Sequence, residues 1–133
     1  MPEIEVVLHP KRADIVLLTA PASPDQRCLI GHSELQHLGA GWIVNVGRGS
    51  LIDEGALVQA LTTGRLRGAG LDVTLVEPLP VESTLWDLPN VVITAHNGGD
   101  SPRFGARWGD LFQRNLAAFA GAGEWVNRIA AQP

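Results

Sequence analysis

The side chains best suited to chemistry in this sequence each follow a short apolar segment, and they are Arg48, Glu77 and His96. In open α/β sheets, the carboxyl ends of parallel strands form one edge, and ligands bind at that edge. If the apolar segments are neighbouring strands, a guanidinium, a carboxylate and an imidazole converge there. The sequence therefore predicts a site that binds an anion and transfers a proton.

Four apolar segments have the length of β-strands and are rich in the residues that strands favour. They are residues 13–19, 42–46, 68–73 and 90–94. Such runs are typical of parallel strands covered on both faces. Helix signals separate them: a serine, a proline and a glutamine in Ser23–Gln26, a capping-box spacing in Ser33–Gln36, and Asp53 before a helix that ends near Thr63. The pattern predicts an α/β fold with a parallel sheet flanked by helices.

A long helix is predicted over residues 101–120, near the end of the sequence. Ser101 and Pro102 mark its start. Its apolar side chains fall near one face, and they are Phe104, Trp108, Leu111, Phe112 and Phe119. We expect this face to pack against the sheet of the same chain.

Composition disfavours several classes of protein. The 133 residues carry a net charge of −4 and no basic cluster, so we expect neither a nucleic acid nor a membrane as partner. The single cysteine, Cys28, excludes an internal disulfide, and we expect it to be a buried thiol in a helix. No His, Asp and Glu cluster has the spacing of metal ligands, so no metal site is expected. Without a leader or a membrane-spanning run, we expect a cytoplasmic protein.

Three ordered motifs carry a resemblance to a known family. They occupy residues 45–49, then 70–73 with 77–80, then 90–91 with 94–96. On these motifs, the chain from about Ala13 to about Ile129 resembles the carboxyl-terminal part of the NAD-binding domain of the NAD-dependent D-2-hydroxyacid dehydrogenases. The resemblance implies a Rossmann-like fold. It also implies an oxidoreductase that transfers a hydride between NAD(H) and a small D-2-hydroxy acid or 2-keto acid.

The resemblance implies a catalytic role for each of the three residues named first. Arg48 matches the arginine that holds the substrate carboxylate, to which a planar guanidinium can bind bidentately. His96 matches the acid/base residue, which gives a proton to the keto oxygen as the hydride arrives. Glu77 matches its carboxylate partner. Because a carboxylate favours the protonated imidazole, we expect Glu77 to extend keto-acid reduction to higher pH.

The family's cofactor contacts also map onto this sequence. The implied cofactor-binding residues are Ala20, Pro21, Val46, Gly47, Arg48, Asp72, His96, Gly98 and Gly99. Asp72 matches the acceptor for the nicotinamide carboxamide. Independently of the family, a carboxylate at the end of an apolar strand needs a donor nearby. The cofactor is NAD or NADP, because no matching residue distinguishes the two.

The family's Gly-rich turn, which holds the cofactor pyrophosphate, has no counterpart in residues 1–133. We therefore expect a single, truncated dinucleotide-binding domain that lacks the first Gly-rich βαβ unit. Residues 1–12 do not align with the family, and one extra strand is an option for them.

Two functions of different classes stay open. The first is the catalytic half of a D-2-hydroxyacid dehydrogenase, acting on a small acid whose identity the sequence does not decide. The second is a non-catalytic module for dimerisation or partner binding. Because a truncated parallel sheet exposes a strand edge, we expect a homo-oligomer or a chain completed by a further segment.

Overall fold

The computed structural model describes residues 13–21 and 28–128. The chain divides into two compact units, residues 1–98 and 99–133, which are treated separately below. The single domain expected from the length stays a prediction. The extra strand considered for residues 1–12 and the helix start at Ser23–Gln26 lie outside the described residues.

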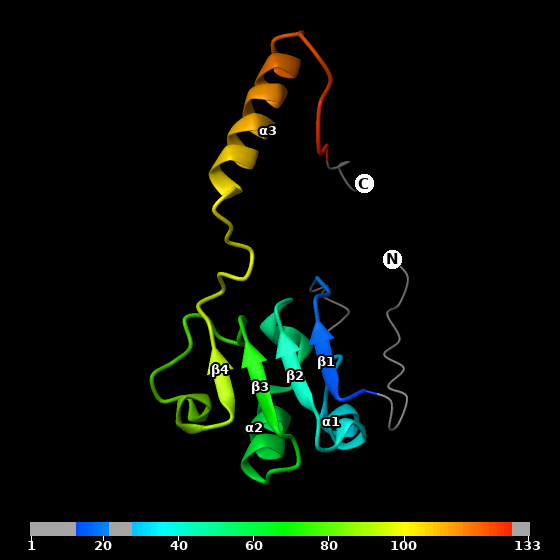
Figure 1. Ribbon diagram of the computed structural model, residues 1–133, viewed down its shortest axis with the longest axis vertical. Helices are drawn as coiled ribbons and strands as arrows, with labels where there is room; N and C mark the ends of the chain where they lie inside the picture. The colour runs from blue at the N-terminus through cyan, green and yellow to red at the C-terminus, as the bar shows by residue number, and fades with distance from the viewer. Residues whose placement is uncertain (1–12, 22–27, 129–133) are drawn as a thin grey trace. The chain divides into compact units, whose positions relative to one another are not determined.

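The described part of the first unit contains a parallel sheet of four strands. They are β1 (Ile15–Leu18), β2 (Trp42–Asn45), β3 (Gly68–Leu71) and β4 (Val91–Ile93). The strands lie in sequence order and each pairs in parallel with the next, so their four arrows point the same way in Figure 1. Each strand is shorter than its predicted segment, but the parallel α/β fold is confirmed. The segments that follow the strands therefore all begin at one edge of the sheet.

Two α-helices and two short 3-10 helices accompany the sheet. They are α1 (His32–Leu38), α2 (Glu54–Thr62), η1 (Gly49–Leu51) and η2 (Thr84–Asp87). The predicted cap of α2 is confirmed, because the Asp53 side chain accepts a hydrogen bond from the Ala56 N–H at 3.0 Å. Helix α1 begins at His32, one residue before Ser33, which the sequence predicted as the cap. The cap is Gly31, and its N–H donates to Glu34 Oε2 at 2.9 Å.

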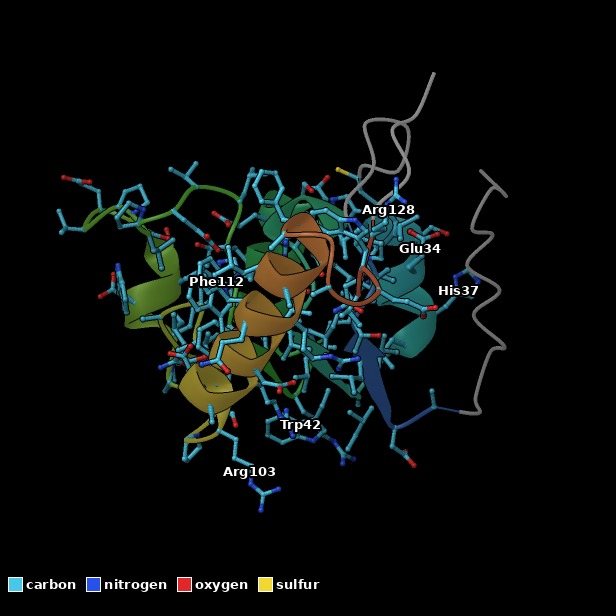
Figure 2. All side chains as sticks on the ribbon, turned by 90° about the horizontal axis from the view of Figure 1, so that it is seen from above. Glu34, His37, Trp42, Arg103, Phe112 and Arg128 are labelled. Atoms are coloured by element: carbon cyan, nitrogen blue, oxygen red, sulfur yellow. The ribbon has the colours of Figure 1, made fainter. Side chains whose placement is uncertain are left out.

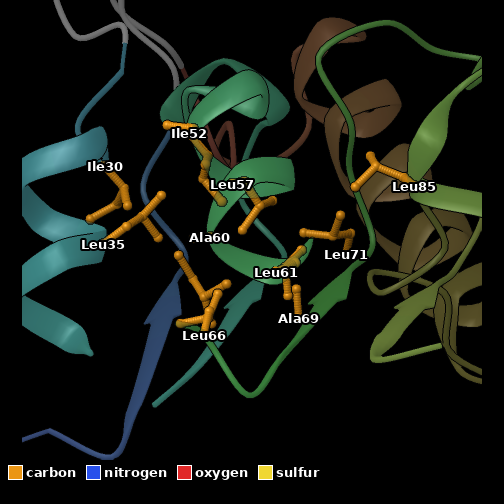
Figure 3. Packing of buried hydrophobic residues seen from close by; sticks show 12 residues of the cluster. Ile30, Leu35, Ile52, Leu57, Ala60, Leu61, Leu66, Ala69, Leu71 and Leu85 are labelled. Atoms are coloured by element: carbon orange, nitrogen blue, oxygen red, sulfur yellow. The ribbon is translucent and has the colours of Figure 1, made fainter. Parts of the chain in front are cut away.

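The core of the first unit lies between one face of the sheet and the helices α1 and α2. Its buried side chains come from α1, α2 and alternate strand positions, and Figure 3 labels Leu35, Leu57, Ala60, Leu61, Ala69 and Leu71 among them. Ile43 of β2 belongs to the same cluster. Burying one large aliphatic side chain stabilises a fold by about 1.5–3 kcal/mol. This packing makes the sheet a rigid support for the loops that follow its strands.

The opposite face of the sheet is exposed. Ile15, Leu17 and Val92 point away from the core, and 62%, 59% and 67% of their surfaces are exposed. Sequence reasoning expected cover on both faces, whereas helices of the described part of the first unit cover only one.

The expectation for Cys28 is wrong. This residue is exposed and lies outside α1, with a φ of 53°. Its backbone N–H donates to the Ser50 carbonyl at 2.8 Å, and Ile30 pairs with Ile52 two residues further on. Partners distant in the sequence therefore hold this segment outside a helix.

In the second unit, residues 99–128 are described, and they contain one helix, α3 (Phe104–Phe119). It begins later than predicted, because the Ser101 hydroxyl accepts from the Arg103 N–H and so forms a turn before the helix. Its apolar stripe is exposed, and Trp108 stacks on Phe112, which Figure 2 labels, with 5.6 Å between ring centroids. Packing of this stripe against the sheet stays a prediction. None of the helices that the structure describes has the length and apolar character that a membrane span requires.

Candidate active site

His96 and Glu77 are in direct contact at the carboxyl edge of the sheet. His96 follows β4 and Glu77 follows β3, and these strands are neighbours. The imidazole Nδ1 lies 2.8 Å from Glu77 Oε2, while the Thr74 N–H donates to Glu77 Oε1 at 3.0 Å. Both side chains remain partly open to solvent, with 47% and 38% of their surfaces exposed. Because Nδ1 is engaged by Glu77, Nε2 is the ring nitrogen that can reach a ligand.

The surroundings of Glu77 favour its ionised form. The hydrogen bond with His96 lowers the pKa of Glu77 most, followed by the bond from the Thr74 N–H. The charges of His96 and Arg48 lower it further. Of these causes, the charge of Arg48 has the smallest effect on the pKa of Glu77.

Arg48 comes from the turn after β2. Its Nη1 donates to the carbonyl of the preceding residue, Gly47, at 2.7 Å. The residue as a whole is exposed. A planar group with several donors at this place can bind a carboxylate in two parallel hydrogen bonds.

Asp72 directly follows β3 and is 8% exposed. Its carboxylate accepts hydrogen bonds from the Thr94 hydroxyl, from the Asn97 N–H at 3.1 Å and from the Gly98 N–H at 2.8 Å. The Thr94 bond lowers the pKa of Asp72 most, and the Gly98 bond comes second. The donor that the sequence required for this buried carboxylate is thus supplied by the loop after β4.

The bonds of Asp72 also fix the backbone on either side of His96. His96 has a φ of 55°, which is uncommon for a residue with a side chain. The hydrogen bonds from Thr94 before it and from Asn97 and Gly98 after it hold this turn. A Cβ on Gly98 would come 2.7 Å from Asp72 Oδ2, so the close approach requires glycine. Sequence reasoning did not predict the hydrogen bond from Thr94 to Asp72, although a hydroxyl residue directly after β4 could have indicated it.

The remaining predicted cofactor residues fall at two other places. Ala20 and Pro21 follow β1, and Val46 and Gly47 follow β2 beside them. A Cβ on Gly47 would come 2.7 Å from the Ala20 carbonyl oxygen, so the two strand ends are in contact. Gly99 begins the second unit, and its place relative to these residues is not defined. The roles of all these residues stay predictions.

Replacing Gly49 with alanine should destabilise the fold, because the new Cβ would overlap the Thr74 carbonyl group. This glycine lets the turn after β2 lie against the loop that leads to Glu77. We expect the free energy of unfolding to fall by about 1–3 kcal/mol, a usual cost of overpacking. Urea denaturation measures the change. Gly99→Ala is the matched control, since no atom lies within 4 Å of its Cβ position; equal stability of the two variants would contradict the prediction.

A cavity of about 570 Å³ adjoins the candidate catalytic pair. Glu77 and His96 form part of its polar wall, and Leu79, Trp86 and Ile93 form part of its apolar wall. Its size is that of sites for small molecules. Within the described ranges, no three His, Cys, Asp or Glu side chains form a group that could hold a metal ion.

Comparison with known proteins gives matches to dehydrogenases and reductases of hydroxy and keto acids. Residues 5–98 match the sequence profile described as D-isomer specific 2-hydroxyacid dehydrogenase, NAD binding domain. The match begins before Ala13, so the expectation that residues 1–12 do not align with the family is wrong for residues 5–12. A glyoxylate/hydroxypyruvate reductase B from Pectobacterium carotovorum is 46% identical over 87 residues, which are 65% of this chain and 27% of the relative. A glycerate dehydrogenase from Methylorubrum extorquens is 35% identical over 97% of this chain and 41% of the relative. The chain therefore spans less than half the length of these relatives.

A solved structure shares the fold. The NADPH-dependent glyoxylate/hydroxypyruvate reductase of Sinorhizobium meliloti, in complex with NADP and malonate, superimposes with a TM-score of 0.76 at 36% identity. The match covers 88% of this chain and 37% of that chain.

Proposed function

The chain belongs to the D-isomer specific 2-hydroxyacid dehydrogenase family, and from this premise we propose that it carries the proton-transfer and carboxylate-binding residues of an oxidoreductase. The reaction is the reversible reduction of a small 2-keto acid to a D-2-hydroxy acid. The single observation that carries the proposal is the contact of 2.8 Å between His96 Nδ1 and Glu77 Oε2.

Each of the three residues has one task in this reaction. Arg48 binds the substrate carboxylate and places the keto group beside His96. His96 gives the proton on Nε2 to the keto oxygen during reduction and accepts it back during oxidation. Glu77 holds Nδ1, so that the ring keeps its orientation and its positive charge is stabilised. A nicotinamide supplies or accepts the hydride when it is bound.

The residues at the strand ends fit a nicotinamide cofactor. Val46 is apolar but 44% exposed at the end of β2, as expected for a side chain that an aromatic ring covers. Gly47 has no Cβ, which leaves room beside it. Asp72 Oδ2 accepts one protein hydrogen bond, from Gly98, and has a second lone pair for a carboxamide. We propose NAD or NADP as the cofactor.

The names of the relatives suggest the substrates to try first. They act on glyoxylate, hydroxypyruvate or glycerate by name, and the Sinorhizobium reductase was crystallised with NADP and malonate. We propose that this chain takes small keto acids of the same kind.

A titration tests the proposal directly. NADH and NADPH are each added to the chain, and quenching of its four tryptophans reports binding. Glyoxylate, hydroxypyruvate and pyruvate are then added separately, and the absorbance of the reduced cofactor is followed. Consumption of cofactor that depends on the keto acid supports the oxidoreductase. Binding without consumption would restrict the function to a nicotinamide site.

A dimerisation or partner-binding module is the second candidate function. The exposed apolar face of the sheet, which includes Ile15, Leu17 and Val92, favours it. On this proposal, the chain keeps its sheet but performs no chemistry, and it acts as a homo-oligomer or together with a further segment. Failure to bind either reduced cofactor in the titration would favour this candidate over the oxidoreductase.

Replacing Glu77 with glutamine should lower the pH above which keto-acid reduction fails. The pKa of Glu77 lies below its ordinary value of 4.5, chiefly because of the hydrogen bond with His96, so the carboxylate is charged at neutral pH. Its negative charge faces the ring that gives the proton, and glutamine removes that charge. We expect the limit to move to lower pH, and the move to be small because the pair is partly exposed to solvent.

The pH profile of kcat/KM for glyoxylate measures this change. Glu82→Gln is the matched control, since Glu82 is an exposed carboxylate after β3 that lies outside the described hydrogen bonds of the site. A limit at the same pH in Glu77→Gln and the parent chain would rule out the role given to Glu77.

A further inference from the structure

Asn45 is a buried polar residue, and both hydrogen bonds of its side chain go to the turn that carries Arg48. It is the last residue of β2 and is 1% exposed. Its Nδ2 donates to the Arg48 carbonyl at 2.9 Å, and its Oδ1 accepts from the Gly47 N–H at 3.0 Å. Burial of an amide is unfavourable unless both of its ends are bonded, and here both ends are bonded to one turn.

The backbone of Asn45 is anchored on both sides by the sheet. It pairs with Leu18 of β1 and with Leu71 of β3, and its carbonyl accepts from the Asp72 N–H at 2.9 Å. The side chain therefore transmits the fixed position of β2 to Gly47 and Arg48. The same strand β3 leads on to Glu77, so Asn45 ties the arginine turn to the strand that positions the carboxylate.

The turn is also held from its other side. Gly49 packs against the backbone of Thr74 and Leu75, where a Cβ would overlap the Thr74 carbonyl. The Leu75 N–H in turn donates to Glu54 Oε2 at 3.2 Å. The turn after β2 and the loop after β3 are thus in contact, and Asn45 is the side chain that fixes the first of them to the sheet.

An apolar residue would suit the position of Asn45 if packing were its only task. The residues on the same face of the sheet, such as Ile43, Ala69 and Leu71, are buried and apolar. We propose that Asn45 is a positioning residue: it fixes the turn that presents the Arg48 guanidinium, and so sets how strongly the site prefers a substrate carboxylate. This inference rests on the proposed function.

The test compares two substrates in each variant, glyoxylate and its neutral amide, glyoxylamide. Asn45→Asp keeps an acceptor for the Gly47 N–H but loses the donor to the Arg48 carbonyl. We expect the ratio of kcat/KM for glyoxylate to kcat/KM for glyoxylamide to fall about tenfold or more, as expected when a charge-assisted bond is misplaced. A reduced amount of folded protein lowers both values equally and leaves the ratio unchanged. Asn45→Leu, which keeps neither bond, should lower the ratio at least as far.

Asn90→Asp is the matched control. Its side chain also donates to backbone carbonyls, those of Leu61 and Arg67, but at the opposite end of the strands. We expect it to leave the substrate ratio unchanged. An equal loss for both substrates in Asn45→Asp, or an equal fall of the ratio in Asn90→Asp, would overturn the inference.

Amide hydrogen exchange separates this inference from the proposed function. The Gly47 N–H is the amide that the Asn45 side chain protects. Faster exchange of this amide in Asn45→Leu than in the parent supports the proposal that Asn45 holds the turn, and unchanged exchange overturns it. If the parent chain reduces neither substrate, the proposed function has failed, and this exchange measurement alone decides whether Asn45 holds the turn.

Discussion

Replacement of His96 by alanine is expected to lower keto-acid reduction by orders of magnitude while cofactor binding is retained. The keto oxygen needs a proton as the hydride arrives, and His96 is the imidazole that contacts a carboxylate at the strand edge. Positioned acid/base groups contribute about 10²–10⁴-fold to rates, so kcat/KM for glyoxylate should fall by about that factor. Steady-state consumption of NADH measures the loss, and tryptophan quenching measures the retained binding.

A second histidine provides the control for this variant. His37 is exposed on α1, where its Nδ1 lies 2.7 Å from the Ser33 carbonyl oxygen of the same helix. His37→Ala should reduce glyoxylate at the rate of the parent chain. If His96→Ala retained the parent rate as well, the proton would come from another group, and the site centred on His96 and Glu77 would have to be abandoned.

The main features of the first unit could be predicted from local sequence, because local physics determines them. Val, Ile and Leu in short runs favour strands, and a side chain such as Asp53 caps a helix within three residues of itself. Since parallel strands place all their carboxyl ends at one edge, the order of the segments predicted that Glu77 and His96 lie on the same edge. Their pairing was implied by the family resemblance, and the direct contact also requires that β3 and β4 are neighbours in the sheet.

Strand pairing explains what the sequence could not predict. Leu71 pairs with Ile93, so the next residues, Asp72 and Thr94, lie side by side and form their hydrogen bond. A shift of one residue in that register would reverse the faces and break the bond. The left-handed φ of His96 depends on the same bonds, and therefore it too was not predictable from local sequence.

Distant contacts account for the wrong expectation at Cys28. Its segment pairs with the chain around Ser50, which follows the next strand. The helix signal in Ser23–Gln26 is local and carries no information about that partner.

The second large effect is expected at Arg48, where charge and shape can be separated by two substitutions. Arg48→Lys keeps a positive charge but loses the planar fork that binds a carboxylate with two hydrogen bonds. Arg48→Gln loses both. Bonds to charged groups contribute about 1.5–3 kcal/mol, so each step should lower kcat/KM for glyoxylate by about 10- to 100-fold. The loss should appear mainly in KM, because Arg48 binds the substrate carboxylate in both the ground state and the transition state.

Two controls test whether the loss comes from the carboxylate contact of Arg48: the neutral substrate glyoxylamide and a substitution at a distant arginine. The neutral amide has no carboxylate, so its reduction should change far less than that of glyoxylate in both Arg48 variants. Arg67, which precedes β3 at the opposite end of the strands, provides the control, and Arg67→Lys should change neither substrate. If Arg48→Lys had the same kcat/KM for glyoxylate as the parent chain, charge alone would be sufficient to bind the substrate. Equal losses for glyoxylate and glyoxylamide would instead place Arg48 outside the carboxylate site, because only the acid can use two parallel bonds to a guanidinium.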